Sequence, residues 1–310
     1  MRAREETEVP MTSTGGGGAG IVLLTGSEGA IGSHVGPALE AAGYDLRSLD
    51  LRPPRSVGGD HRPGDLLDLE AVREAMDGVA AVVHAGAIPW DRDDGSSVIA
   101  TNVLGTWNVL QAAVEAGVGR VVGLSSINAQ GSTGGRRPVP YLPLDDAAPH
   151  HPTSPYQLSK HLMEEICRSF SETHDIITIC LRPVFVAHPA SPHADGFGTD
   201  AFVEQWRHEL WAYVDIRDVV EAVLLSLGLA GVRHDSFLLA ARDTSVAEPT
   251  RDLVERFHPD VPWTDVTPDD YFARDPYRSL IDCHHARDVL GWEARHSWRD
   301  SSPQTREPGS

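Results

Sequence analysis

The chain has 310 residues, of which 41% are hydrophobic and 23% charged, a composition typical of a globular protein that can bury a substantial core. Its formal net charge of −19 argues against nucleic acid or an anionic membrane surface as a partner, because both bind basic faces. No stretch approaches the roughly 20 apolar residues that a membrane span needs.

The first 20 residues predict a disordered leader, because charged residues run into four consecutive glycines without the apolar segment of a signal peptide. Short apolar runs and helix-like segments then alternate. The runs predict buried strands at residues 21–24, 46–49, 80–84, 121–124 and 176–181. The segments between them predict helices at residues 33–42, 69–76, 98–116 and 154–173. This alternation predicts an α/β fold with a doubly wound parallel sheet, a Rossmann domain over residues 21–186.

The regularity weakens after residue 186. Residues 213–227 predict one more helix and residues 236–240 one more strand, so that 213–240 is expected to pack onto the Rossmann domain. Residues 187–212 and 241–299 would form a small C-terminal substrate-binding lobe, and residues 300–310 a disordered tail.

Cysteine and histidine usage points away from a disulfide framework and from metal binding. The three cysteines, Cys167, Cys180 and Cys283, are widely separated, which favours a reducing compartment such as the cytoplasm. The histidine pairs at 150–151 and 284–285 have no cysteine or carboxylate at ligand spacing, so we predict no metal.

A glycine-rich segment, TGSEGAIG, follows the first predicted strand and precedes a predicted helix, the context of a dinucleotide-binding loop. Gly26 would permit the tight turn, Gly29 the approach of the backbone to a pyrophosphate, and Gly32 the packing of the helix on the sheet. Ala30 and Ile31 complete the turn into the helix, whose N–H groups and dipole would face the phosphates.

An acidic residue, Asp50, ends the second predicted strand. A carboxylate there would accept hydrogen bonds from the adenosine ribose and repel a 2′-phosphate, which favours NAD over NADP. Arg52 and Arg55 leave NADP open as an alternative, because an arginine just beyond the acid can hold the extra phosphate.

One lysine stands out in a chain whose other basic residues are all arginine. Of the 26 basic residues only Lys160 is a lysine, and it lies four positions after Tyr156 in the segment YQLSK. Lysine is a compact cation with rotatable donors, whereas guanidinium is a planar fork. The exception therefore indicates a site that needs an ammonium group.

With TGSEGAIG and YQLSK in place, the sequence resembles the extended branch of the short-chain dehydrogenase/reductase superfamily, the NAD-dependent epimerases and dehydratases. The resemblance covers residues 21 to 295 and implies a Rossmann fold, NAD as cofactor and hydride transfer at an alcohol or carbonyl. The further matching stretches are Asp65-Leu66, HAGA at 84–87, NVLGTWNVLQAA at 102–113, VVGLSSINAQG at 121–131, LRPVFV at 181–186 and YVDIRDVVEA at 213–222.

The resemblance also implies roles for the catalytic residues. Tyr156 would be the general acid/base that exchanges a hydroxyl proton while hydride moves to or from the nicotinamide. Lys160, on the same helix face, would favour the phenolate of Tyr156 and bind the nicotinamide ribose. Ser126 would position the substrate oxygen. The adjacent Ser125 is the alternative assignment. Only one of the two can face the substrate, because consecutive side chains of a strand point to opposite faces, and we favour Ser126.

The remaining residues implied at the cofactor site come from several segments. Asn102 would support its helix and a water near Lys160. The others are Asp65 and Leu66 against the adenine, Ala85, Gly86 and Ala87 along the cofactor groove, and Pro183 past the nicotinamide edge. Asn128 and Gln130 are open to two interpretations, a substrate contact or a plain turn.

The segment after LRP departs from the nucleotide-sugar pattern. Relatives that act on nucleotide sugars usually carry an asparagine there, followed by a basic segment, but residues 184–186 are VFV and only Arg207 and His208 precede YVDIRD as cations. This favours a small, sugar-like substrate such as a free sugar or uronic acid, oxidised by a dehydrogenase.

Other functions stay open at this stage. The main alternative is a sugar or nucleotide-sugar epimerase or dehydratase. A non-catalytic NAD(P) sensor is disfavoured, because it would not need Ser126, Tyr156 and Lys160. A homodimer is common among similar proteins, and the sequence leaves it open.

Overall fold

A computed structural model describes residues 20–54, 59–191 and 196–301. The predicted leader up to residue 19, Arg55 and the predicted tail from residue 302 lie outside the described residues. In the described part, seven parallel strands form one sheet in the order β3-β2-β1-β4-β5-β6-β9. The strands are β1 (Ile21–Thr25), β2 (Asp45–Asp50), β3 (Asp60–Pro63), β4 (Val79–His84), β5 (Arg120–Leu124), β6 (Ile177–Pro183) and β9 (His234–Leu239).

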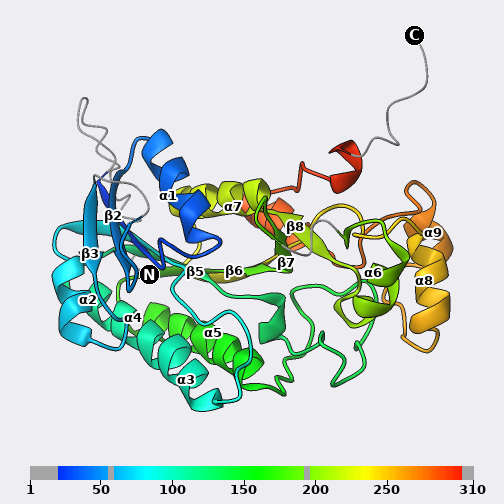
Figure 1. The fold of residues 1–310 in the computed structure, drawn as a ribbon, viewed down its shortest axis with the longest axis horizontal. Helices are drawn as coiled ribbons and strands as arrows, with labels where there is room; N and C mark the ends of the chain where they lie inside the picture. Colours follow the sequence, from blue (N-terminus) through cyan, green and yellow to red (C-terminus); the bar gives the residue numbers. More distant parts are fainter. Residues whose placement is uncertain (1–19, 55–58, 192–195, 302–310) are drawn as a thin grey trace, which may run out of the picture.

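Helices cover both faces of this sheet (Figure 1). On one face, α1 (Gly32–Ala41) packs against α7 (Ile216–Gly228). The other face carries α2 (Leu69–Ala75), α3 (Gly95–Ile99), α4 (Gly105–Glu115) and α5 (Pro155–Thr173). The prediction of a doubly wound α/β fold is therefore confirmed.

The central strands are mostly apolar because both of their faces are buried. Leu23 and Val82 belong to the hydrophobic cluster on one side of the sheet, whereas their neighbours Leu24 and Val83 belong to the cluster on the other side. All four side chains are fully buried, and each such burial contributes about 1.5–3 kcal/mol.

The chain order reverses beside β1. From β1 the chain builds outward through β2 and β3, and it then returns to β4 on the other side of β1. Helices on opposite faces leave a crevice at such a switch point, beyond the carboxyl ends of the strands. This crevice places the segments after β1, β4 and β5 close to one another.

The structure differs from the sequence-based expectation at three places, two of which are β3 and the helix expected at 98–116. β3 is a short polar edge strand without an apolar pattern, and an ion pair from Arg47 to Asp60 at 2.6 Å joins it to β2. The single helix expected at 98–116 is divided by a π-helical turn, η1 (Ala100–Leu104), between α3 and α4.

The helix expected from residue 213 was wrong for its first three residues. Tyr213 to Asp215 form β8 (Tyr213–Asp215), which pairs with β7 (Phe185–Ala187) in a small parallel sheet. α7 begins only at Ile216, and the Asp215 carboxylate caps it by accepting from the Arg217 backbone N–H at 2.9 Å.

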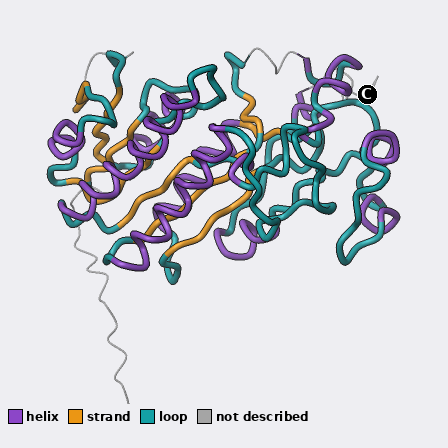
Figure 2. The backbone as a smooth tube through the Cα atoms, turned by 90° about the horizontal axis from the view of Figure 1, so that it is seen from below, coloured by secondary structure: helices purple, strands orange, loops and turns teal. Residues whose placement is uncertain are grey.

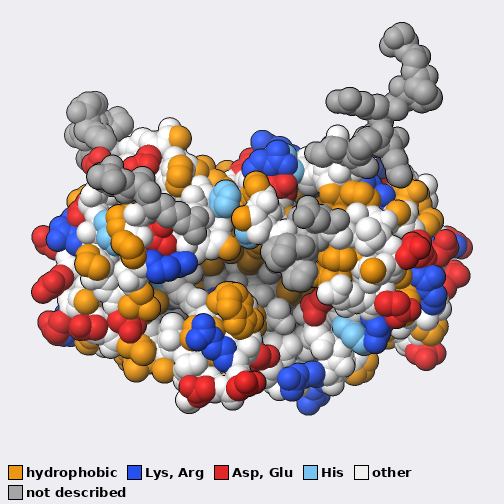
Figure 3. Space-filling view, viewed as in Figure 1, with side chains coloured by type: hydrophobic (Ala, Val, Ile, Leu, Met, Phe, Trp, Pro, Cys, Tyr) orange, Lys and Arg blue, Asp and Glu red, His pale blue; other side chains and the backbone are white. Residues whose placement is uncertain are grey.

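The end of the molecule where loops predominate carries α6 (Asp200–Gln205), η4 (Arg207–Glu209), α8 (Thr250–Phe257) and α9 (Pro268–Phe272) (Figure 1 and Figure 2). Two further short helical segments follow in the chain, η5 (Ala286–Leu290), which contacts α7 and β9, and η6 (Trp298–Ser301). Acidic and basic side chains are interspersed on the face seen in Figure 3. None of the helices within the described ranges has the length and apolar character to span a membrane.

Candidate active site

The loop between β1 and α1 is shaped by its glycines. Gly26 has φ +69°, and a Cβ there would lie 2.6 Å from the Gly86 backbone. A Cβ on Gly32 would lie 2.1 Å from the Gly26 carbonyl oxygen, and one on Gly29 3.0 Å from the same atom. Larger residues at 26 and 32 would therefore force the loop open.

This loop has the features of an anion cradle. The Ser27 hydroxyl is buried and has no hydrogen-bond partner among the described residues. The first turn of α1 has neither a side-chain cap at Ile31 nor an acidic residue, so no side chain there competes with an anion or repels it. The residues present thus fit the pyrophosphate of a dinucleotide.

The Asp50 carboxylate lies at the end of β2 beside this loop. It accepts from the Glu28 backbone N–H at 3.0 Å and from the Arg52 backbone N–H at 2.9 Å, and the Arg52 guanidinium lies 3.3 Å away. Burial alone would raise the pKa of Asp50, but these hydrogen bonds and the Arg52 charge hold it below its ordinary value. Asp50 is therefore an ionised hydrogen-bond acceptor, and the Arg52 guanidinium forms an ion pair with it.

The groove wall beyond β4 is formed by small residues and by Leu66. The backbone N–H groups of Ala85 and Gly86 donate to the Thr25 carbonyl and hydroxyl at 3.1 and 3.3 Å. Buried Leu66 packs so closely on Gly86 that a Cβ there would lie 2.8 Å from its side chain.

The other predicted groove residues lie around this wall. The Asp65 carboxylate accepts from the Leu67 backbone N–H at 3.0 Å. Ala87 follows Gly86 and is partly buried, and Pro183 ends β6 at the same edge of the sheet. The contacts of these loop and groove residues with a cofactor stay predictions.

Tyr156 and Ser126 come together from different elements. Tyr156 lies in the first turn of α5, and Ser126 is the second residue after the end of β5. The Ser126 hydroxyl is within hydrogen-bonding reach of the Tyr156 phenol and lowers its pKa. Ser125 instead donates to the buried Glu164 carboxylate at 2.5 Å. Of the two serines, Ser126 is the one that faces the tyrosine.

Lys160 lies one turn further along α5 and is almost completely buried. Its Nζ donates to the Leu124 carbonyl at 2.6 Å. Burial lowers the pKa of Lys160 to about 8, although the nearby Cys180, Glu164 and Cys167 side chains act in the opposite direction. The ammonium form still predominates at neutral pH.

The expected effect of Lys160 on Tyr156 is not what this structure shows. Instead of being lowered by the lysine, the pKa of Tyr156 is raised to about 12, because burial outweighs the Ser126 hydroxyl and the Asp91 carboxylate raises it further. Sequence spacing placed the two side chains on one helix face, but it could not reveal how little solvent reaches the phenol.

Asn102 lies in the π-helical turn η1 and is buried. Its side chain bonds both backbone groups of Ile88, at 2.7 and 3.0 Å, and the Ser159 hydroxyl at 2.9 Å. It therefore ties the segment after β4 to the helix that carries Tyr156, and its expected support of a water near Lys160 stays a prediction.

Several polar residues beside Tyr156 were missed by sequence reasoning. Asp91 accepts from the Tyr156 backbone N–H at 2.8 Å. Gln157 reaches Asn128 at 3.4 Å and the Thr133 carbonyl at 3.1 Å. Glu209, from η4, has its carboxylate 3.8 Å from the position of a Cβ on Gly134. No periodic pattern links these positions, so only the neighbourhood of Gln157 with Tyr156 could have pointed to them.

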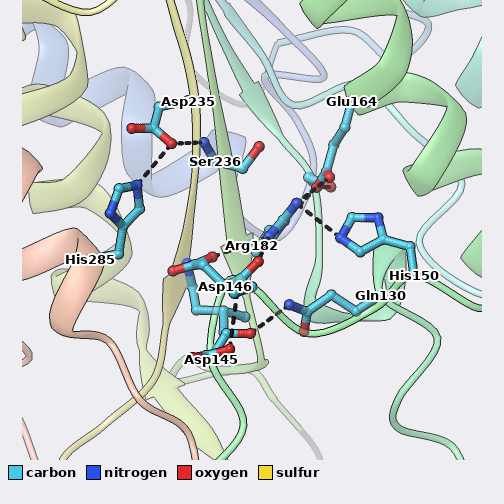
Figure 4. Close-up of polar contacts among 12 residues, drawn as sticks. Gln130, Asp145, Asp146, His150, Glu164, Arg182, Asp235, Ser236 and His285 are labelled. Atoms are coloured by element: carbon cyan, nitrogen blue, oxygen red, sulfur yellow. Dashed lines mark hydrogen bonds and ion pairs between the residues drawn. The ribbon is translucent and has the colours of Figure 1, made fainter. Parts of the chain in front are cut away.

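A buried charged cluster supports α5 from behind the site (Figure 4). The Arg182 guanidinium, at the end of β6, contacts both oxygens of Glu164 at 2.9 and 2.7 Å and Asp146 at 3.2 Å. Since Glu164 also accepts from Ser125, this cluster joins β5, β6 and α5 behind Lys160.

Several other polar and aromatic residues have structural roles. Asp218 is fully buried and accepts from the backbone N–H groups of Arg295 and His296. Gln130 is buried and donates to the Asp145 carbonyl at 2.7 Å. The tryptophans Trp206, Trp211 and Trp263 pack on neighbouring aromatic rings.

The histidine pairs bond within the protein. His150 contacts His161 at 3.0 Å, and His285 contacts Asp235 at 2.9 Å. Nowhere in residues 20–54, 59–191 and 196–301 do three His, Cys, Asp or Glu side chains come together as a metal site would require.

Comparisons with known proteins agree with this geometry. A solved short-chain dehydrogenase/reductase superfamily protein from Agrobacterium tumefaciens, with bound NAD, matches with a TM-score of 0.69 and 26% identity over 89% of this chain and 93% of that one. An NAD-dependent glucose-6-phosphate dehydrogenase of Haloferax volcanii is 36% identical over 179 residues, and a uronate dehydrogenase of Pseudomonas syringae is 29% identical over 164 residues.

These two curated relatives match over 52% of this chain and over 66% and 58% of their own lengths. The match to a family model is broader. Residues 22–237, from β1 to within β9, match the model of the NAD dependent epimerase/dehydratase family. The chain therefore belongs to the NAD-dependent epimerase/dehydratase family, in the extended short-chain dehydrogenase/reductase group.

Proposed function

We propose that this protein is an NAD-dependent oxidoreductase that oxidises a hydroxyl group of a small, sugar-like substrate. The observation that carries the proposal is the meeting of the Tyr156 phenol and the Ser126 hydroxyl beside the dinucleotide loop, with the buried ammonium of Lys160 one helical turn away. A proton donor and acceptor, a hydroxyl that can orient an oxygen and a fixed positive charge are what alcohol oxidation requires.

The dinucleotide would be held by the loop from Gly26 to Gly32, with its pyrophosphate against Ser27 and the start of α1 and its adenosine ribose on Asp50. When bound, NAD supplies the hydride acceptor. The carboxylate of Asp50 is ionised and already engaged with Arg52, which supports NAD over NADP because a 2′-phosphate would meet a negative charge.

The protein side chains would handle the proton. Tyr156 takes the proton of the substrate hydroxyl during oxidation and returns it during reduction. Burial keeps its phenol protonated, so it is set up as an acid, and it needs a cation to act as a base. Lys160 is the cation on the same helix, and Ser126 holds the substrate oxygen toward the phenol.

A sugar-like substrate is supported by the relatives and by the polar wall beside Tyr156. The Haloferax and Pseudomonas relatives are named for oxidising a sugar phosphate and uronates. Asn128 and Glu209 supply an amide and a carboxylate near the catalytic tyrosine, and such groups exchange hydrogen bonds with sugar hydroxyls.

The test is NADH formation from NAD by the purified protein, followed by absorbance with glucose, glucose 6-phosphate, uronic acids and simple alcohols. Tyr156→Phe is the negative control, since it removes only the phenolic oxygen. Oxidation of one substrate class that disappears in this variant supports the proposal. Equal rates in wild type and Tyr156→Phe would contradict the assigned acid/base.

The epimerase or dehydratase reaction is the alternative, because the matching family is named for both. In such an enzyme hydride returns to the substrate and NAD is regenerated. This alternative would be favoured if no NADH formed in the assay, NAD stayed bound after purification, and a sugar was converted to its epimer or to a dehydrated product.

We also propose a homodimer through the helices beside the site. Leu104, Trp107 and Leu158 are 50%, 47% and 40% exposed, and η1, α4 and α5, which carry them, are neighbouring helices. Large exposed apolar side chains on one face mark association surfaces. Sedimentation of wild type and Trp107→Glu would test this, because a dimer is expected to dissociate in the variant.

Two further assignments stay proposals. We place the substrate-binding lobe at residues 187–212 and 241–299, beside a nucleotide-binding domain of residues 21–186 with 213–240. The cytoplasm is proposed as the location because Cys167, Cys180 and Cys283 are free thiols, which a reducing compartment preserves.

A further inference from the structure

The first turn of the catalytic helix α5 is completed by a residue from another part of the chain. Ser154 is the N-cap of this helix, and Pro155 follows it without a backbone N–H. The N–H of Tyr156, which a helix start leaves without a partner inside the helix, donates to the Asp91 carboxylate at 2.8 Å. The next two N–H groups donate to the Ser154 hydroxyl and carbonyl at 3.2 and 2.9 Å. Asp91 therefore supplies the acceptor that the helix itself does not provide for its catalytic residue.

The carbonyl of Tyr156 is also held. It accepts from the Ser159 hydroxyl at 2.8 Å, and that hydroxyl accepts from the Asn102 amide at 2.9 Å. Asn102 in turn binds both backbone groups of Ile88, three residues before Asp91. Both backbone groups of the catalytic tyrosine are thus tied to the segment that follows β4, one directly and one through two side chains.

This segment carries two carboxylates that cap different helices. Asp94 caps α3, which begins at the next residue, by accepting from the Ser96 N–H at 3.0 Å. Asp91 caps the catalytic helix, which begins 64 residues later in the chain. A carboxylate suits both places, because the N-terminus of a helix carries a partial positive charge. The comparison shows that the contact of Asp91 serves α5 and not its own segment.

Asp91 also brings a negative charge to a turn with few other charges around it. The elements packed against the start of α5 are α3, η1 and η2 (Ile127–Ala129), and none of the three contains an ionisable residue. Within the helix, the Lys160 ammonium is turned to the Leu124 carbonyl. The other charged or titratable neighbours are Arg92, Asp93 and Asp94, exposed on the same loop, Glu115 of α4, Cys180 and Arg182 of β6, and His234 and Asp235 of β9.

The charge of Asp91 acts on the phenol in a known direction. Burial is the main cause of the raised pKa of Tyr156, the Ser126 hydroxyl opposes it, and the Asp91 carboxylate adds to it. A nearby negative charge disfavours the phenolate, because the phenolate is itself negative. Asp91 lies at an exposed position, so its effect acts partly through solvent and should be weakened by salt.

We propose that Asp91 is a positioning residue for Tyr156, whose carboxylate holds the backbone of the first turn of α5 and whose charge keeps the phenol in its protonated form. The inference rests on the proposed oxidoreductase function, in which Tyr156 is the acid/base. It adds a residue outside the catalytic helix that determines where the phenol lies and at which pH it ionises.

Two variants separate holding from charge. Asp91→Asn keeps an oxygen that can accept from the Tyr156 N–H but removes the charge, whereas Asp91→Ala removes both. The measurement is kcat/KM between pH 6 and pH 10.5 with saturating NAD and whichever of glucose, glucose 6-phosphate and glucuronate gives NADH. The pH of half-maximal kcat/KM should fall by about half a pH unit in both variants, because the phenolate forms more easily. In Asp91→Ala the plateau of kcat should also fall about tenfold, because the phenol is no longer held in place.

The matched control is Asp94→Asn, the same change on the same loop at a carboxylate that caps α3. Its pH of half-maximal kcat/KM should equal that of wild type. Salt gives a second check on the charge effect. In 1 M salt, where the Debye length is about 3 Å, most of the difference between wild type and Asp91→Asn should disappear.

Hydrogen exchange followed by mass spectrometry tests the contact without turnover. In peptides that cover residue 156, the Tyr156 amide should exchange at least about tenfold faster in Asp91→Ala than in wild type, because its hydrogen bond is lost. Asp94→Asn should leave this exchange unchanged. Circular dichroism of all three variants confirms that they are folded.

The outcomes distinguish this inference from the proposed function. If NADH forms and both Asp91 variants keep the wild-type pH of half-maximal kcat/KM, or if no variant shows such a pH, the charge effect is overturned and the oxidoreductase function stands. An equal shift in Asp94→Asn would also overturn it, because any charge on the loop would then act alike. If no sugar gives NADH, the proposed function fails, and hydrogen exchange alone decides the contact. Unchanged exchange of the Tyr156 amide in Asp91→Ala would overturn the holding role.

Discussion

Replacing Glu164 by Gln is expected to destabilise the protein strongly, because the carboxylate is the main partner of a buried guanidinium. The Arg182 side chain is 7% exposed and that of Glu164 5%. Both carboxylate oxygens contact Arg182, at 2.9 and 2.7 Å, and one of them also accepts from Ser125 at 2.5 Å. Glutamine keeps one acceptor and places an amide N–H where the other oxygen accepted, so two donors face each other (Figure 4).

The size of the effect follows from the burial of the pair. Breaking a buried ion pair by removing one partner costs about 3–5 kcal/mol. Asp146 still lies 3.2 Å from the Arg182 Nη1, so the remaining charge is partly compensated and the lower end, about 3 kcal/mol, is expected. A loss of this size is a large fraction of the roughly 5–15 kcal/mol that stabilises a domain.

Urea unfolding followed by circular dichroism measures the loss, and the next residue provides the control. Glu165 lies on the same helix and pairs with Arg168, but both side chains are about half exposed. Glu165→Gln should therefore cost at most about 1 kcal/mol. If the two variants lose the same free energy of unfolding, the central role assigned to the Glu164–Arg182 pair is wrong.

Three further changes test the site itself. Lys160→Arg keeps the charge but should lower kcat about 100-fold or more, measured as NADH formation; wild-type turnover would show that no ammonium is needed. Asp50→Ala should lower kcat/KM for NAD by about tenfold and raise the ratio of kcat/KM for NADP to that for NAD, because the carboxylate proposed to bind the ribose hydroxyls is lost; an unchanged ratio would show that Asp50 does not contact the ribose. His84→Gln should make the free energy of unfolding depend less on pH below about pH 6.5. Burial and the Lys160 charge lower the pKa of His84 to about 3, so below about pH 6.5 only the unfolded state takes up its proton, and stability falls by about 1.4 kcal/mol per pH unit as the pH drops. Urea unfolding of both proteins at pH 6 and pH 5 measures this slope, and identical slopes would mean that His84 is charged in the folded state.

The parts of the fold that sequence predicted well are those set by local chemistry. The turn at Gly26 requires positive φ and a missing Cβ, and both requirements are visible as a glycine next to an apolar run. Val22, Leu23 and Leu24 of β1 are all apolar because each face of the sheet meets its own hydrophobic cluster. Residue type alone carries this information.

The parts that sequence missed depend on contacts between distant segments. β3 has no apolar pattern and is attached through Arg47 and Asp60. Residue 213 continues a helical pattern, yet the Tyr213 hydroxyl donates to Asp243 at 2.7 Å and its backbone pairs with β7. Glu209 comes near Gln157 only because η4 folds onto the loop at Gly134. None of these pairings leaves a periodic trace in the chain.

Burial also explains why a single lysine is kept beside Tyr156, in a way that spacing alone did not. The same exclusion of solvent raises the pKa of Tyr156 to about 12 and lowers that of Lys160 to about 8. The two values move apart, so the phenol stays protonated until a cation assists it, while the ammonium form of Lys160 still predominates at neutral pH. The Lys160 ammonium is enclosed and donates to the Leu124 carbonyl at 2.6 Å. A compact cation with rotatable donors suits this enclosed place, whereas the larger planar guanidinium of arginine does not.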